Sequence, residues 1–145
     1  MGILLAKVLA KPFVDTDIEL QNLMGVSLQD YLNLHGVNAL RKAEEKYVES
    51  LELAGHVIST GGSVIYGERA MESLKKHNQI IYLEVSIETM ISRLGDYSRR
   101  GIAADLSEGL EGMYCDRKPL YERFADIIID ANQPPEVVLQ NILRT

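Results

Sequence analysis

The sequence predicts an α/β domain in which a parallel sheet is covered by helices on both faces. Four short apolar runs alternate with segments of helical length and pattern along the 145 residues. These predicted strands lie at residues 12–15, 56–60, 79–84 and 126–130. Alternating strands and helices favour a parallel sheet, and near-continuous apolar strands indicate burial on both faces. One domain spanning residues 1–145 is expected, because no internal repeat, low-complexity tract or linker divides the chain.

The first half of the chain has a helical pattern on either side of the first strand. Residues 2–10 are apolar with helical spacing up to Pro12, where a helix must stop. Thr16 and Glu19 have the spacing of a capping box, which predicts that Thr16 caps the helix after the strand. The other helices predicted in this half span residues 17–24, 27–34 and 38–53, the first two closed by glycines.

The second half continues the alternation of helices and strands. Residues 95–112 hold four glycines and charges of both signs with little apolar periodicity, which indicates a flap. A helix is expected to grow out of the flap and to reach Ala125. The other helices predicted here span residues 67–77, 86–94 and 134–143, and Pro134-Pro135 marks the start of the last one.

Composition excludes several classes of function. The net charge of −6 argues against nucleic acid or an anionic membrane as the main partner. Cys115 is the only cysteine, so no internal disulfide can form, which fits a reducing compartment. The three histidines lack zinc-ligand spacing. The apolar start of the chain is too short to span a membrane and has no signal-peptide pattern. We therefore expect a soluble cytoplasmic protein.

Two acids, Asp15 and Asp17, follow the first predicted strand directly. In an open α/β sheet, ligands bind beyond the carboxyl ends of the strands, so these acids are candidates for chemistry. They could hold a metal ion through water or accept a proton from a hydroxyl group. They could equally be a helix cap with favourable charge at a helix N-terminus. Spacing alone leaves both interpretations open.

Further candidates lie where the other strands end and in the helices that follow. Arg41 and Glu44 belong to the predicted helix 38–53, and Gly61-Gly62 ends the second strand. Arg100 falls in the flap, and Arg117 begins a run that continues Lys-Pro-Leu-Tyr. Each has an ordinary structural explanation, such as a solvated charge or a tight turn. Taken together they are informative, because this topology collects the strand-end loops at one edge.

In combination, these segments resemble shikimate kinase, a family of small P-loop kinases of aromatic amino-acid biosynthesis. The resemblance runs in register from about residue 2 to the end of the chain. It is carried by Leu9-x-x-Pro-Phe-Val-Asp-Thr-Asp17, Leu40-Arg41-Lys-Ala-Glu44, Ser59-Thr-Gly-Gly62, Arg100 and Arg117-Lys-Pro-Leu-Tyr-Glu-Arg-Phe-Ala-Asp126. It implies ATP-dependent phosphorylation of the 3-hydroxyl of shikimate.

The resemblance also implies roles on the shikimate side of the site. Asp17 would orient the attacking hydroxyl and accept its proton. Arg41 and Arg117 would grip the carboxylate, because paired guanidinium groups suit a planar carboxylate. Backbone N–H groups of Gly61-Gly62 would bind the substrate, and Glu44 would hold Arg41 and contact a ring hydroxyl.

On the nucleotide side, the resemblance implies ATP as co-substrate and Mg²⁺ as cofactor. Asp15 would hold Mg²⁺ through water. Arg93 would lie near the adenine ring. Arg100 would close with the flap onto the transferring phosphate, so that charge neutralisation promotes phosphoryl transfer.

The sequence departs from the family pattern in two ways. Ser63 stands where the family has the third glycine of a triplet, and Leu40 replaces an aromatic residue. The family's first strand and G-x-x-x-x-G-K-[ST] phosphate loop would precede Met1, and these 145 residues contain no such motif. We therefore expect a P-loop NTPase fold, of the nucleoside-monophosphate-kinase type, that lacks its central strand between residues 57–60 and 80–83.

Three interpretations follow from this missing motif. In the first, the complete protein is a shikimate kinase and this sequence begins inside it. In the second, the chain is a shikimate-binding pseudoenzyme. In the third, it is a remnant held by assembly with another chain. The intact set of residues expected to contact shikimate favours the first. In each case the chain as given is expected to be inactive or poorly active. A monomer is expected unless the missing strand promotes association.

Overall fold

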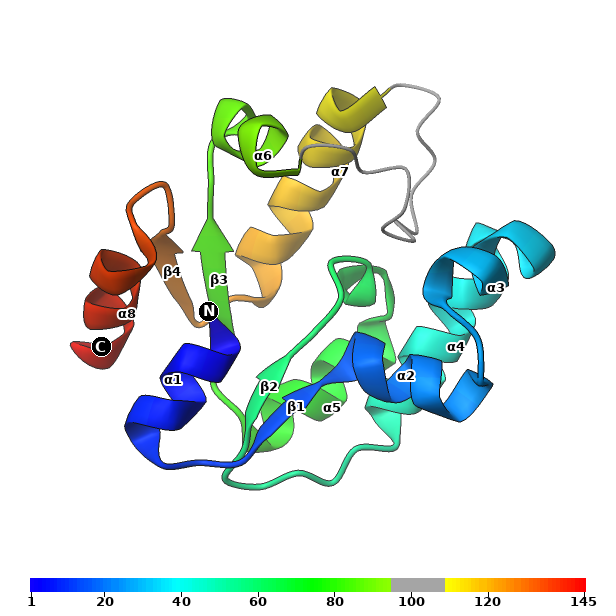
Figure 1. The fold of residues 1–145 in the computed structure, drawn as a ribbon, viewed down its shortest axis with the longest axis horizontal. Helices are drawn as coiled ribbons and strands as arrows, with labels where there is room; N and C mark the ends of the chain where they lie inside the picture. Colours follow the sequence, from blue (N-terminus) through cyan, green and yellow to red (C-terminus); the bar gives the residue numbers. More distant parts are fainter. Residues whose placement is uncertain (95–108) are drawn as a thin grey trace.

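Two pairs of parallel strands lie at the centre of the fold (Figure 1). In this computed structural model, which describes residues 1–94 and 109–145, β1 (Phe13–Asp15) pairs with β2 (Val57–Ser59). β3 (Ile81–Glu84) pairs with β4 (Ile127–Asp130). The four predicted parallel strands are confirmed, with β1 beside β2 as expected. Within the described residues β2 and β3 do not pair with each other, so the sheet is interrupted where the sequence provides no central strand.

The helices occur in the order that the sequence predicts. Those of the first half are α1 (Gly2–Leu9), α2 (Thr16–Met24), α3 (Leu28–His35) and α4 (Val37–Glu49). Those of the second half are the 3₁₀ turn η1 (Val64–Tyr66), α5 (Glu68–His77), α6 (Ile87–Leu94), α7 (Gly109–Phe124) and α8 (Pro135–Leu143). None of these helices is long and apolar enough to cross a membrane, among the residues that the structure describes.

Helix boundaries follow local chemistry, and three of them correct the sequence-based prediction. The cap of α2 is Asp15, whose Oδ1 accepts hydrogen bonds from the backbone N–H groups of Asp17 and Ile18, so the predicted Thr16 capping box is wrong. Helix α4 ends at Glu49, four residues before the predicted end. Residues 109–112, assigned to the flap from sequence, form the first turn of α7, and residues 95–108 lie outside the described part of the chain.

Helices cover both faces of each strand pair. Ile58 of β2 packs with α4 and α5 in a buried cluster that includes Val48, Ala70 and Leu74. The other face of β2 carries α1, and a side chain on Gly2 would collide with Ser59 and Phe13 there. Alternating strand residues point to opposite faces, which explains this division.

The β3–β4 pair is covered in the same way. Its inner cluster contains Ile129 together with Val138 and Ile142 of α8. On the opposite face, the ring of Tyr82 stacks against Tyr121 of α7, with 5.0 Å between ring centroids. The predicted layered α/β architecture is therefore confirmed for both halves of the interrupted sheet.

Candidate active site

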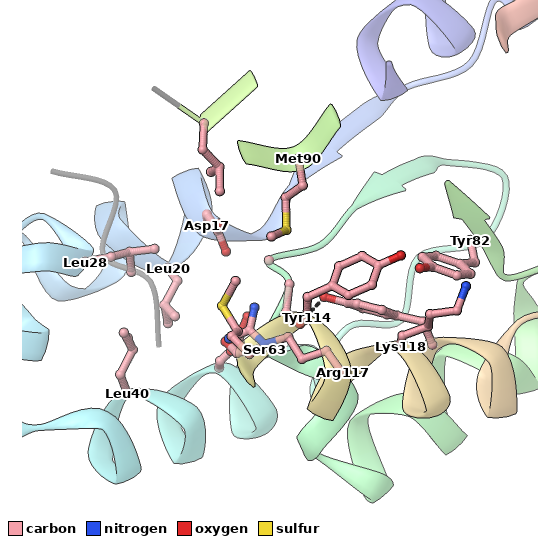
Figure 2. A pocket seen from close by; sticks show the side chains of 16 residues that line it. Asp17, Leu20, Leu28, Leu40, Ser63, Tyr82, Met90, Tyr114, Arg117 and Lys118 are labelled. Carbon is pink, nitrogen blue, oxygen red and sulfur yellow. Dashed lines mark hydrogen bonds between the residues drawn. The ribbon is translucent and has the colours of Figure 1, made fainter. Parts of the chain in front are cut away.

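A cavity of about 320 Å³ opens beside the carboxyl ends of the strands, as the topology predicts (Figure 2). Its apolar lining consists of Leu20, Leu28 and Leu40 from α2, α3 and α4, Met90 and Leu94 from α6, and Met113 from α7. Its aromatic wall consists of Tyr82 from β3 and Tyr114, Lys118 and Tyr121 from α7. The remaining lining residues, Asp17, Glu44, Gly61, Gly62, Ser63 and Arg117, include five that the sequence predicts as site residues.

Gly61 is the point where two carboxylates meet. A Cβ atom added to Gly61 would collide with Oδ1 of Asp17 and Oε1 of Glu44, so only glycine allows this approach. The N–H of Gly61 donates a hydrogen bond of 3.4 Å to Oγ1 of Thr16, which is almost fully buried at 1% exposure. Two segments that are distant in sequence, the start of α2 and the middle of α4, thus converge on one glycine.

Gly62 makes the corresponding contact with α7. The hydroxyl of Tyr121 donates a hydrogen bond of 2.7 Å to the carbonyl oxygen of Gly62. A Cβ atom on Gly62 would lie 2.9 Å from Nη1 of Arg117 and 3.0 Å from the Tyr121 hydroxyl. The backbone after β2 therefore lies directly against α7 and leaves no room for a side chain there.

Glu44 is a buried carboxylate with defined partners. It accepts a hydrogen bond from the hydroxyl of Ser63. Burial is the main reason why the pKa of Glu44 is raised; the Ser63 hydrogen bond opposes the shift. The charge of Asp17 raises this pKa further, and the charges of Arg117 and Arg41 lower it. Glu44 therefore interacts electrostatically with every charged residue that the sequence assigns to the substrate side.

Asp17 has the electrostatics of a proton acceptor near a hydroxyl group. Its pKa is raised above the ordinary range, first by burial and second by the negative charge of Asp15. A carboxylate with a raised pKa is a stronger base than an exposed one. Its side chain lines the cavity, where a bound hydroxyl could reach it.

The two arginines share an aromatic neighbour. Arg117 is buried, at 7% exposure, and lines the cavity from α7. Arg41 is half-buried and is not among the lining residues, but its Cζ lies 3.8 Å from the ring centroid of Tyr66. Cζ of Arg117 lies 5.5 Å from the same centroid. The structure thus brings both predicted arginines to one ring, which the sequence analysis did not single out.

The aromatic wall was also missed from sequence. Lys118 pairs with Glu84 and, at 3.3 Å, with Glu122, while the Tyr114 hydroxyl donates to the carbonyl of Val85 at 3.0 Å. Burial raises the pKa of Tyr82 to about 12. Lys118 and Tyr121 lie in the motif that begins at Arg117, whereas Tyr82 and Tyr114 belong to no motif. Only the fold reveals that these residues share a cavity.

Two predicted nucleotide-side residues, Asp15 and Arg93, are not among the residues that line this cavity. Asp15 caps α2 with one carboxylate oxygen. Arg93 donates hydrogen bonds to the carbonyl oxygens of Ala131, Asn132 and Gln133, the first at 2.8 Å. Arg100 falls in the part of the chain that the structure does not describe.

A magnesium site has partial support from the acids after β1. The described residues contain no cluster of three or more potential metal-ligating side chains. Mg²⁺ commonly keeps several waters and needs only one or two carboxylates when phosphates supply the other ligands. The charge of Asp15 raises the pKa of Asp17, which shows that the two acids lie in the same region. This donor set fits Mg²⁺ held mainly by water and nucleotide.

Known proteins provide independent evidence for the family. The family model for shikimate kinase matches residues 1–145. The shikimate kinases of Pseudomonas syringae pv. tomato and Enterococcus faecalis are each 31% identical to this chain, across 99% of it and 86% and 88% of their own lengths.

Solved structures agree with this assignment. The structure of shikimate kinase from Aquifex aeolicus matches with a TM-score of 0.83 at 30% identity, covering 99% of this chain and 85% of that one. Shikimate kinase from Acinetobacter baumannii, in complex with shikimate, matches with a TM-score of 0.87 at 26% identity, covering 99% and 82%. The chain therefore belongs to the shikimate kinase family.

Proposed function

We propose that the cavity binds shikimate and that the protein phosphorylates the shikimate 3-hydroxyl with ATP. Family membership supports the reaction, and the similar Acinetobacter baumannii structure contains shikimate. The observation that carries the proposal is the convergence at Gly61-Gly62 of two carboxylates and a buried guanidinium group. Such a set can recognise a small ring that carries both hydroxyl groups and a carboxylate.

Each substrate-side residue has a physical role in this proposal. Arg117 and Arg41 hold the shikimate carboxylate by charge-assisted hydrogen bonds. Glu44 and the N–H of Gly62 bind ring hydroxyls, while the apolar lining excludes water from the carbon ring. The N–H of Gly61, which the sequence assigned to the substrate, already donates to Oγ1 of Thr16. Asp17 orients the reacting hydroxyl and accepts its proton, a role that its raised pKa supports.

ATP and Mg²⁺ complete the proposed reaction. Mg²⁺, if bound with ATP, would supply neutralisation of the charge that develops during transfer. Asp15 would hold it through water, since one oxygen of this carboxylate already caps α2. Arg93 would border the adenine site from α6, where it is held by the loop after β4, and Arg100 would contact the transferring phosphate.

Titration calorimetry with shikimate tests the binding half of the proposal. Replacing Arg117 with Ala should weaken binding by about 1.5–3 kcal/mol, the usual contribution of a hydrogen bond to a charged group. Arg123→Ala is the matched control, because Arg123 is an exposed residue of the same helix and pairs with Glu68 at 2.6 Å. An Arg117→Ala protein that is folded and binds shikimate as the wild type does would remove Arg117 from the site.

The alternative is a shikimate-binding module without kinase activity. In the kinase reaction a G-x-x-x-x-G-K-[ST] loop cradles the phosphates and supplies a lysine, and these 145 residues do not include that loop. We propose that the 145 residues alone phosphorylate shikimate near the background rate.

The two candidates differ in what an N-terminal extension does. Adding a strand and a G-x-x-x-x-G-K-[ST] loop before Gly2 should produce ATP-dependent phosphorylation if the protein is a kinase. Binding of shikimate without activity in the extended chain would support the binding module. Equal rates with and without the extension would show that the phosphates are held in another way.

A further inference from the structure

We propose that Tyr66 is a positioning residue that aligns Arg41 and Arg117 as one carboxylate clamp. The inference rests on the proposed function, in which these arginines bind the substrate carboxylate. It adds a residue that does not line the cavity and that no motif in the sequence marks. Tyr66 would act through the arginines and need not touch the substrate.

The ring of Tyr66 lies at the meeting point of the two guanidinium groups. Cζ of Arg41 lies 3.8 Å from the ring centroid, within the range of a close cation–π contact. Cζ of Arg117 lies 5.5 Å from the same centroid, near the outer limit of that range. The two arginines come from α4 and α7, so Tyr66 is the contact that connects these helices at the proposed clamp.

Electrostatics explains why the clamp needs such a residue. Two guanidinium groups held on one carboxylate site repel each other before the anion arrives. The face of an aromatic ring is negative and offsets part of that repulsion at both groups. An aliphatic side chain of similar size would fill the same space without this effect.

Tyr66 is itself held rigidly, which a positioning residue requires. Its hydroxyl donates a hydrogen bond of 2.6 Å to Oδ2 of Asp116, the residue before Arg117 in α7. Its ring packs against the buried cluster that contains Val48 and Ile65. Its backbone N–H donates to the carbonyl of Ser63 at 3.1 Å, within the turn that follows Gly61-Gly62. The ring is therefore fixed relative to α7 and to the glycine turn.

A purely structural role for Tyr66 predicts a different pattern of mutant behaviour. If the ring only filled the core, its loss would lower the melting temperature and leave the affinity of the folded protein unchanged. If the ring positions the clamp, affinity for carboxylates falls while the protein stays folded. Tyr66→Phe keeps the ring and loses only the bond to Asp116, so it should retain most of the affinity that Tyr66→Leu loses.

The test measures binding of two probes, shikimate and cyclohexanecarboxylate, to the wild-type chain and its variants. Tyr66→Leu should bind shikimate about 3- to 30-fold more weakly, the range that a desolvated cation–π contact supports. Tyr66→Phe should stay within about threefold of the wild type. In an Arg41→Gln background, Tyr66→Leu should weaken shikimate binding clearly less. Tyr66 acts through Arg41, so replacing Arg41 first removes most of what the ring contributes.

Nuclear magnetic resonance on the wild-type chain provides a check that needs no variant. Side-chain protons of Arg41 should show a ring-current shift and nuclear Overhauser contacts to the Tyr66 ring, and these should be retained with shikimate bound. Absence of those contacts would overturn the proposal. So would equal shikimate affinity of folded Tyr66→Leu and wild type, or additive effects with Arg41→Gln.

The outcomes separate this inference from the proposed function. Binding of cyclohexanecarboxylate that depends on Tyr66, without binding of shikimate, would overturn the function and support the clamp. Shikimate binding that is indifferent to Tyr66 would overturn the clamp and leave the function in place. If neither probe binds the wild-type chain, both are wrong.

Discussion

Ser63 donates a hydrogen bond to the buried carboxylate of Glu44, and this contact ties the turn after β2 to α4. Both side chains are buried, with exposures of 8% and 4%. The serine stands at the position for which the sequence comparison led us to expect a glycine. This substitution therefore has a physical effect. Burial raises the pKa of the Glu44 carboxyl, and the hydrogen bond from the Ser63 hydroxyl lowers it.

Replacing Ser63 with Ala should destabilise the protein. The Glu44 carboxylate would lose a donor inside a buried site, which costs about 1–3 kcal/mol of unfolding free energy. Chemical denaturation at neutral pH measures this difference. Ser50→Ala is the control, because Ser50 is exposed and its hydroxyl bonds the Tyr47 carbonyl at 2.6 Å, so its cost should stay below about 0.5 kcal/mol. Equal costs for the two variants would contradict the importance of the Ser63–Glu44 contact.

Gly61→Ala should abolish most of the shikimate affinity. The new methyl group would collide with the carboxylates of Asp17 and Glu44, and at least one of them would have to leave the cavity wall. We expect a loss of at least about tenfold by calorimetry, equivalent to about 1.4 kcal/mol. Gly55→Ala is the control for a general glycine effect, because Gly55 has φ of 76° with open space around it. That variant should lower stability and leave the affinity unchanged.

Asp17→Asn should make the protein more stable at neutral pH. The folded-state pKa of Asp17 is raised above its unfolded value, so the folded state binds more protons between those two values. Stability from this group is therefore fully present below the unfolded pKa of about 4 and is lost as pH rises through the folded pKa.

Because Asp17 destabilises the folded protein only as pH rises, the two proteins are best compared over a range of pH. Melting temperatures of wild type and Asp17→Asn should differ most at pH 7–8 and converge below about pH 4. Glu19→Gln removes an exposed carboxylate from the same helix and serves as the control. A variant that is less stable than wild type at pH 8 would contradict the burial argument. In an active extended chain, the same Asp17→Asn change should reduce turnover by about 10²–10⁴, the usual contribution of a general base.

Arg93→Ala should loosen the loop between β4 and α8. Its guanidinium group donates to three consecutive carbonyl oxygens, including that of the buried Ala131. Amide hydrogen exchange in residues 131–133 should accelerate by about fivefold, which corresponds to about 1 kcal/mol of local stability. Arg69→Ala, at an exposed position of α5, should leave these amides unchanged. Unaltered exchange in Arg93→Ala would show that other contacts hold the loop.

The layered fold was predictable because its signals are local. Apolar runs and glycine or proline boundaries identify strands and helices to within a few residues, and parallel pairing follows from the alternation. The cap of α2 was assigned to the wrong residue because Asp15 and Thr16 both have capping side chains. Only the backbone geometry shows that Thr16 is already helical and buried.

The site was predictable only where a motif marks it. Asp17, Glu44, Gly61, Gly62 and Arg117 belong to recognisable segments, and the structure gathers them on one cavity. Tyr66 and Ser63 depend on contacts between segments 19–50 residues apart, which no local pattern encodes. The roles of all these residues, like those of Asp15, Arg41, Arg93 and Arg100, stay predictions.

The hydrogen bonds from Tyr66 to Asp116 and from Tyr121 to Gly62 connect residues 50 and 59 positions apart in the chain. Closing loops of that size costs entropy before any contact is gained, so such pairings form slowly during folding. Helix α7 should thus dock on the glycine turn after α4, η1 and α5 have assembled with one another. If docking follows the folding transition state, a ligand that bridges these segments will act mainly on the unfolding rate. The cavity then contributes to how long the native protein persists, beyond its role in recognition.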